Sequence, residues 1–162
     1  MARAQCLVAR GNKILMVKHH ENKQEYWCLP GGSIEPDELP SESALRELRE
    51  ECNVIGDIVR ETSIVTYSQD YTHYSFLIDI GDQNPCIGND PELEQGQQIL
   101  QEVKWMSLNE ICERDRVYLW SAGLLGVTGF LEEIESWGDD ISYPSCKEEI
   151  SSSHCASEVA TG

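Results

Sequence analysis

Residues 32–54 read GSIEPDELPSESALRELREECNV, and they carry the most specific structural pattern in the sequence. Its second half predicts a helix from about Pro40 to Cys52, because proline is favourable at the first helical position and the apolar residues recur at helical spacing. Asn53 follows the last apolar position, and asparagine tolerates the left-handed conformation that ends many helices. The preceding segment, 33–39, is acidic and is expected to form a loop.

Apolar and acidic side chains occupy neighbouring arcs of this helix at about 100° per residue. The apolar arc, which is expected to face the core, comprises Ala44, Leu45, Leu48 and Cys52. The acidic arc holds Glu47, Glu50 and Glu51. Like charges at this spacing oppose a helix by roughly 0.2–0.5 kcal/mol per pair, and a bound cation would relieve the repulsion. Clustered carboxylates suit Mg²⁺ or Mn²⁺. From spacing alone, the alternative is an ordinary solvated acidic face.

The spacing over the whole segment is more specific than the acidic arc. Gly32 is followed by five residues and Glu38, and seven more residues precede the run RELREECNV over 46–54. This pattern resembles the Nudix box at every position except one, where Asn53 stands in place of the family's last glycine. The departure is mild, because asparagine adopts the same backbone conformation more readily than most residues.

The resemblance continues on both sides of the box. WCLPGG over 27–32 is similar to the family's lead-in, and VKWMSL over 103–108 is similar to its late strand. The resemblance therefore covers roughly residues 3–136. It implies a Nudix-like α/β/α sandwich with a mixed β-sheet between helices. The order of predicted strands and helices indicates the same broad class, α/β or α+β.

The resemblance also implies a reaction. Water would attack a phosphorus atom and cleave the diphosphate linkage of a nucleoside diphosphate joined to another group, with Mg²⁺ or Mn²⁺ as cofactor. The implied metal ligands are Glu47, Glu50, Glu51 and the carbonyl of Gly31. Glu50, Glu47 and Arg46 are the expected catalytic residues: either glutamate could take the proton of the water, and Arg46 would hold a carboxylate in place.

Residues around the acidic arc receive supporting roles. Glu38 and Gly32 are expected to maintain the loop-to-helix geometry. Lys18 and His19 end a predicted strand, where they would either contact phosphate or remain exposed strand-end charges. Tyr71 is a candidate substrate contact, and its alternative is an ordinary strand or turn aromatic. Three carboxylates outside the box are alternative general bases: Glu92, Glu94 and Glu102.

Two other classes of function compete with hydrolysis. A Nudix-like module could sense a nucleotide without cleaving it, but such modules often have eroded boxes, and this box keeps its glutamates. A purely structural acidic domain would not need the Gly31-Gly32 lead-in. The pattern therefore favours a hydrolase, and it leaves the identity of the molecule that carries the diphosphate open.

Composition restricts the partners and the compartment. The 162 residues include 12 Lys and Arg against 29 Asp and Glu, a net charge of −17. Long nucleic acids are held mainly through basic residues, so they are excluded and a small nucleotide is expected. Seven scattered cysteines without a C-x-x-C pair suit a reducing compartment. No long apolar stretch occurs, so we expect a cytoplasmic protein without membrane contact. A homodimer is left open.

The remaining elements follow from periodicity and turn residues. Strands are predicted over 4–9, 13–18, 26–29, 57–68, 73–80 and 99–106. A polar loop is predicted over 20–25 and a long helical segment over 116–137. Residues 1–137 are expected to form the Nudix domain, and 138–162 an acidic, serine-containing flexible tail.

Overall fold

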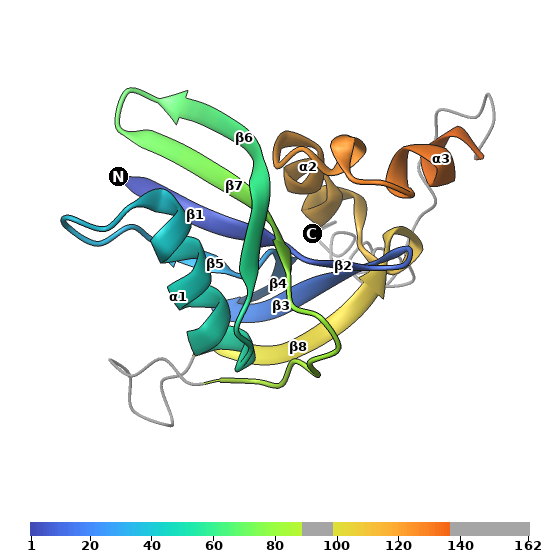
Figure 1. Ribbon diagram of the computed structural model, residues 1–162, viewed down its shortest axis with the longest axis horizontal. Coiled ribbons are helices and arrows are strands. Elements are labelled where there is room, and N and C mark those ends of the chain that lie inside the picture. Colours follow the sequence, from blue (N-terminus) through green and yellow to red (C-terminus); the bar gives the residue numbers. More distant parts are fainter. Residues whose placement is uncertain (89–98, 137–162) are drawn as a thin grey trace, which may run out of the picture.

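The computed structural model describes residues 1–88 and 99–136, and Figure 1 shows their arrangement. The strands are β1 (Ala2–Leu7), β2 (Ala9–Arg10), β3 (Lys13–Glu21), β4 (Gln24–Cys28), β5 (Gly31–Ser33), β6 (Asp57–Ser68), β7 (Tyr71–Asp79) and β8 (Leu100–Ser107). The helices are α1 (Pro40–Cys52), α2 (Glu113–Ser121) and α3 (Phe130–Glu135), with short 3₁₀ turns η2 (Leu108–Glu110) and η3 (Leu124–Gly126).

The strands form two sheets. One has the order β5-β1-β7-β6, in which β1 and β7 run parallel and the other neighbours run antiparallel. In the other, β3 pairs antiparallel with β2, β4 and β8. The predicted α+β class with mixed strand directions is confirmed. The strands are divided over two sheets, because the long β3 takes its partners from β4 and β8 and does not pair with β1.

Two hydrophobic clusters lie on opposite faces of the strands. In β3, Leu15 and Val17 belong to one cluster, and Ile14 and Met16 belong to the other. This alternation follows from the two-residue period of a strand. The first cluster is covered by α1, and the second contains residues of α2 and α3. Figure 1 shows α1 on one side of the strands and α2 and α3 on the other. The strands therefore lie between helices, as predicted.

Helix α1 begins and ends where the sequence predicts. The Glu42 side chain accepts the backbone N–H of Leu39 at 3.0 Å and so supports the first turn after Pro40. Ala44 and Leu48 are fully buried. Asn53 adopts φ 55°, the expected left-handed conformation. The local sequence therefore suffices to define this helix.

Segment 82–88 packs against the C-terminal end of α1. The backbone N–H of Cys86 binds the carbonyl of Cys52 at 3.0 Å, and that of Gly88 binds the carbonyl of Glu51 at 2.8 Å. A Cβ atom at Gly88 would overlap the backbone of α1. Carbonyls that lack partners within the helix are satisfied in this way. This contact places the end of α1 that carries the glutamates.

Two sequence predictions are wrong. Residues 20–25 are not a loop, because β3 continues to Glu21 and β4 begins at Gln24. Between them, Asn22 and Lys23 have φ of 52° and 64°, and positive φ at both central residues allows a tight hairpin. Because the ends of both strands are polar and exposed, an analysis of apolar periodicity does not detect this hairpin.

The segment 116–137 is not one long helix. Helix α2 already ends at Ser121, and α3 begins only at Phe130. Gly123 and Gly129 interrupt the helical path, with φ of 90° and 96°. Glycine adopts this conformation without steric cost, which explains the breaks.

Some predicted residues cannot be compared with the structure. Glu92, Glu94 and the tail predicted over 138–162 lie outside the described residues.

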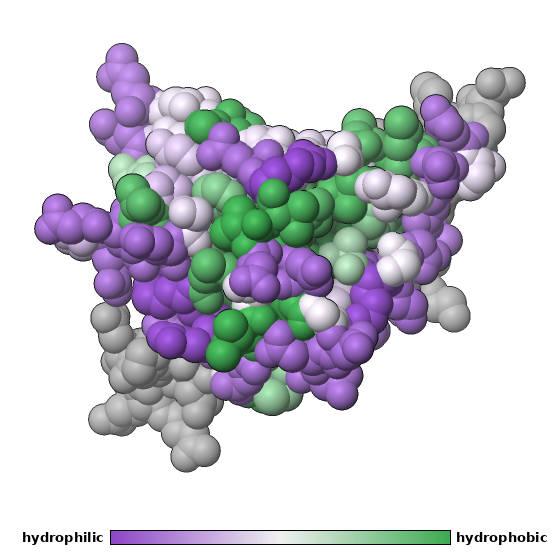
Figure 2. All heavy atoms as spheres, viewed as in Figure 1, coloured by the Kyte–Doolittle hydropathy of each residue, from purple (hydrophilic) through white to green (hydrophobic). Residues whose placement is uncertain are grey.

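Among the residues described, no helix is long and apolar enough to cross a membrane. Exposed apolar side chains do occur on β6 and α2, among them Val59, Ile64 and Val117. Figure 2 shows hydrophobic residues across the middle of one face, with hydrophilic residues along its edges.

The C-terminal end of α1 provides a test of the fold. Asn53→Ala should lower the free energy of unfolding by about 1–2 kcal/mol, because alanine is strained at positive φ. It also loses the bond from Asn53 Nδ2 to the Ile87 carbonyl at 3.0 Å. The measurement is urea denaturation, with Asn53→Gly as the control. The glycine variant loses the bond without the strain, so it should be destabilised less than Asn53→Ala. Equal stability of Asn53→Ala and the unmodified protein would contradict this account.

Candidate functional site

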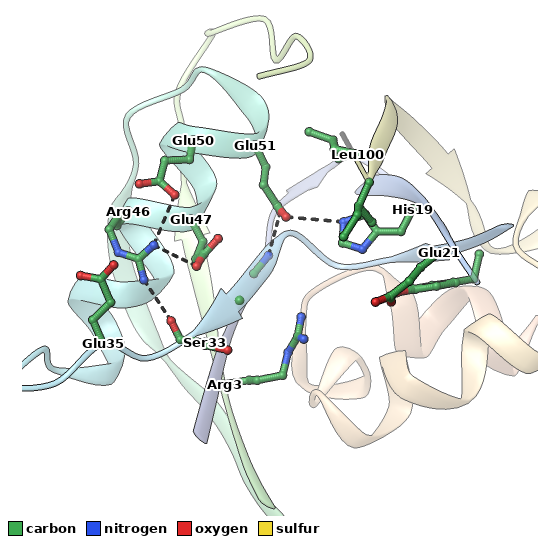
Figure 3. A pocket seen from close by; sticks show the side chains of 14 residues that line it. Arg3, His19, Glu21, Ser33, Glu35, Arg46, Glu47, Glu50, Glu51 and Leu100 are labelled. Atoms are coloured by element: carbon green, nitrogen blue, oxygen red, sulfur yellow. Dashed lines mark hydrogen bonds and ion pairs between the residues drawn. The ribbon is translucent and has the colours of Figure 1, made fainter. Parts of the chain in front are cut away.

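A cleft of about 530 Å³ lies between α1, β5 and the end of β3. Its lining includes the acidic arc of α1, the glycines of β5 and His19 of β3: Gly31, Gly32, Glu47, Glu50, Glu51 and His19. Figure 3 shows the carboxylates projecting from α1 toward the cleft. The structure thus brings together residues that the Nudix resemblance predicts to act together.

The Arg46 guanidinium is the centre of a carboxylate network. Its Nε donates to Glu38 Oε1 at 2.8 Å and its Nη2 to Glu38 Oε2 at 3.1 Å. Its Nη1 lies 2.9 Å from Glu47 Oε1 and 3.3 Å from Glu50 Oε2. The hydrogen bonds from Arg46 lower the pKa of Glu38 to about 2. Arg46 therefore fixes the orientations of three carboxylates.

The Glu47 carboxylate occupies space that a side chain at position 32 would fill, and Gly32 leaves that space free. A Cβ atom there would overlap the Glu47 carboxylate. Burial and the nearby Glu51 raise the pKa of Glu47 to about 7, although Arg46 opposes the shift. A Cβ at Gly31 would overlap the carbonyl of Ala4 on β1. The two glycines therefore let β5 lie between β1 and α1.

Glu51 is held by a different set of donors. Its Oε2 accepts the backbone N–H of Gly31 at 3.0 Å, and its Oε1 lies 3.5 Å from Nε2 of His19. On the other side of the ring, His19 Nδ1 lies 3.9 Å from the Cys28 sulfur. Burial lowers the pKa of His19, but the contacts with Cys28 and Glu51 outweigh it and raise the pKa well above its ordinary value. His19 therefore contacts one of the predicted metal ligands directly.

Other predicted site residues lie elsewhere. Lys18 Nζ lies 3.0 Å from Glu25 Oε2, and Lys18 is not part of the cleft lining. Glu102 is exposed on β8 and also does not line the cleft. Tyr71 lines a second cavity. The periodicity of a strand does not show which side chains of neighbouring strands reach a common cleft, so these positions follow only from the structure.

Several lining residues were not predicted. Arg3, Tyr26 and Ser33 line the cleft, as do the acids Glu21 and Glu35. Arg3 reaches it because β1 pairs with β5 in a register that places Arg3 opposite Ser33. Nothing in the sequence near Arg3 marks it as functional.

The second cavity, also of about 530 Å³, adjoins the carboxylate cleft. The two share Arg3, His19 and Tyr26 in their linings. The second cavity also includes Tyr71 of β7 and Tyr118 of α2. A molecule bound in the cleft could therefore extend into this space.

The cleft can be tested for its fit to a divalent cation. Within residues 1–88 and 99–136, no three His, Cys, Asp or Glu side chains converge in a way that would hold a metal ion as they stand. Glu47 and Glu50 face Arg46, and Glu51 faces Gly31 and His19. The donor chemistry nevertheless fits Mg²⁺ or Mn²⁺, because all three side chains offer carboxylate oxygens in one cleft. Binding would require them to turn from their present partners.

Relatives of known activity match part of the chain. Human "Diphosphoinositol polyphosphate phosphohydrolase NUDT4B" is 35% identical over 78 residues, which cover 46% of this chain and 42% of the relative. Mouse "Diphosphoinositol polyphosphate phosphohydrolase 3-alpha" is 33% identical over 78 residues, which cover 46% of this chain and 47% of the relative. The match thus spans less than half the length of either relative.

Solved structures share the fold. A MutT NUDIX hydrolase from Burkholderia pseudomallei aligns with a TM-score of 0.59 at 17% identity, over 74% of this chain and 95% of that structure. A NUDIX hydrolase from Nitrosomonas europaea aligns with a TM-score of 0.58 at 22% identity, over 70% and 61%. The family model for the NUDIX domain matches residues 1–125, most of the chain. The resemblance of the box is therefore confirmed, and the chain belongs to the Nudix hydrolase family.

Proposed function

We propose that this chain is a divalent-cation-dependent hydrolase that cleaves a diphosphate linkage in a small phosphorylated substrate, by attack of water on phosphorus. The observation that carries the proposal is the meeting of Glu47, Glu50 and Glu51 in one cleft with the Gly31-Gly32 strand. The human and mouse relatives are named as phosphohydrolases of diphosphoinositol polyphosphates, and these names support the proposal.

The residues of the cleft would have different roles in metal binding and catalysis. Glu47, Glu50, Glu51 and the carbonyl of Gly31 would hold Mg²⁺ or Mn²⁺. The bound cation neutralises phosphate charge and lowers the pKa of water. Glu50 or Glu47 would accept the proton of the attacking water. Arg46 orients both carboxylates through Nη1.

Two observations suggest different identities for the substrate. The resemblance of the box implies a nucleoside diphosphate joined to another group, and the relatives' names specify diphosphoinositol polyphosphates. Both molecules carry the diphosphate linkage on which the cleft would act. A nucleotide-binding module without turnover is the competing function, and release of phosphorylated products distinguishes the two. The intact set of three glutamates in the cleft favours turnover.

Glu50→Gln should abolish most Mg²⁺-dependent hydrolysis, by about 100-fold or more in kcat, because it removes a charged ligand and a candidate base. The fold should be retained, since the Glu50 carboxylate is partly exposed, at 29%. Product formation by mass spectrometry and urea denaturation measure the two effects. Glu61→Gln, on the exposed face of β6, is the control and should leave both unchanged. Full kcat in Glu50→Gln would refute the assignment.

His19→Ala should weaken Mn²⁺ binding about 10-fold, because residues that orient metal ligands typically contribute that much to affinity. His19→Gln should restore part of the loss, since its amide can donate to Glu51 in place of Nε2. Electron paramagnetic resonance of free Mn²⁺ gives the affinity without reliance on turnover. His20→Ala is a matched control, because His20 faces Glu25 and lines neither cavity. Unchanged Mn²⁺ affinity in His19→Ala would show that Glu51 is oriented without His19.

Glu38→Gln should lower the free energy of unfolding at pH 7 by about 2 kcal/mol, through loss of charged hydrogen bonds to Arg46. The pKa of Glu38 in the folded protein, about 2, lies below its ordinary value of about 4.3. The stabilisation is therefore complete above pH ~4.3 and is lost as the pH falls toward 2. Denaturation at pH 7 and pH 3.5 should show a smaller difference between the two proteins at the lower pH. A difference that stays constant with pH would contradict an ionic role for Glu38.

A further inference from the structure

Segment 82–88, which packs against the C-terminal end of α1, is held by hydrogen bonds from two other parts of the chain. Gln83 Nε2 donates to the carbonyl of Ile55 at 2.6 Å, and Gln83 Oε1 accepts the backbone N–H of Ile55 at 3.0 Å. Arg10 of β2 donates to the carbonyls of Gly81 and Gln83 at 2.9 and 2.8 Å. These bonds define where the segment lies before it reaches the helix.

Asn53 connects the far end of this segment to α1. It stands where the Nudix box has its last glycine, a residue without a side chain. Asn53 Nδ2 donates to the carbonyl of Ile87 at 3.0 Å and lies 3.5 Å from the sulfur of Cys86. Its φ of 55° is a conformation that glycine adopts without steric cost. The departure from the box therefore adds a hydrogen bond to segment 82–88 while the backbone conformation stays available to glycine.

Gly88 extends this contact to the backbone of the glutamates. It is buried, and its N–H donates to the carbonyl of Glu51 at 2.8 Å. A Cβ atom at Gly88 would overlap the carbonyl oxygen of Glu50, which is part of the helix backbone and cannot turn aside as a flexible side chain could. The carboxylates of Glu50 and Glu51 project from this same turn toward the cleft (Figure 3).

The last turn of α1 needs support from outside the helix. Its carbonyls have no partners within the helix, so donors from other segments must satisfy them. Repulsion among Glu47, Glu50 and Glu51 also opposes the helical conformation at this end. A metal site must hold its ligands within about 0.5 Å of the productive geometry. A small displacement of this turn would therefore disturb two of the proposed metal ligands together.

We infer that Asn53 and Gly88 are positioning residues for metal binding, because they join segment 82–88 to the last turn of α1 and so hold Glu50 and Glu51 toward the cleft. Neither Asn53 nor Gly88 lines the cleft itself. The inference rests on the proposed function, in which the two glutamates bind Mg²⁺ or Mn²⁺.

Two variants at position 53 separate positioning from stability. Asn53→Gly removes the bond to Ile87 without strain and should weaken Mn²⁺ binding about 5-fold, somewhat less than the ~10-fold typical of residues that contact a metal ligand directly. Asn53→Ala removes the same bond and should weaken binding to a similar extent, although it is the less stable variant. Electron paramagnetic resonance of free Mn²⁺ gives the affinities without turnover. A loss confined to Asn53→Ala would attribute the effect to strain and overturn the role of the Asn53 side chain.

Gly88→Ala should weaken Mn²⁺ binding about 10-fold, because the added Cβ forces the backbone of α1 and segment 82–88 apart. Gly126→Ala is the matched control, since a Cβ there would meet only the side chain of Arg60, and it should leave the affinity unchanged. If Gly88→Ala fails to fold, Gln83→Ala tests the same segment by removing its bonds to Ile55 without adding atoms beside α1. It should also weaken Mn²⁺ binding.

A double variant tests whether the two residues act through one segment. Asn53→Gly combined with Gly88→Ala should bind Mn²⁺ little more weakly than Gly88→Ala alone, because the effects of coupled residues do not add. Losses that multiply would overturn the shared route. Mn²⁺ affinities that stay unchanged in both single variants would overturn the inference and leave the proposed function intact. Absence of Mn²⁺ binding by the unmodified protein would refute the proposed metal site together with the inference.

Discussion

The hydrogen bonds of Arg46 are the interaction on which the site depends. One guanidinium binds the carboxylates of Glu38, Glu47 and Glu50, and its Nη2 also donates to the carbonyl of Ser33 at 3.0 Å. It therefore joins β5, the following acidic loop and α1 around one positive charge. Three glutamates within five residues of a helix would otherwise repel one another. Arg46 reduces that repulsion and leaves the acidic arc facing an open cleft.

Close packing between α1 and the strands is the second constraint. Gly31 and Gly32 have no Cβ, so β5 can lie against both the Ala4 carbonyl and the Glu47 carboxylate. The buried side of α1 is fixed by Ala44 and Leu48 in the first hydrophobic cluster. The absence of side chains at Gly31 and Gly32 thus lets β5 lie close to both β1 and the Glu47 carboxylate of α1.

Helix α1 was predictable because its information is local. Its apolar period, the proline at its start and Asn53 at its end all lie within one short stretch, and the structure confirms each of them. The hairpin after β3 and the breaks around α3 were not predicted. They depend on positive φ at single residues, such as Asn22 and Gly129, which the hydrophobic pattern does not register.

The spacing of the box was enough to predict the family, the helix that carries the glutamates and the pairing of Arg46 with a carboxylate. The folded structure was needed to show that His19 contacts Glu51, that Lys18 faces Glu25, and that a cavity lined by aromatic rings adjoins the cleft. Residues a few positions apart on a helix have a fixed geometry, so their spacing can be read directly. Arg3 and Tyr71 come together through the register of β1 with its neighbouring strands, and packing across the whole chain sets that register.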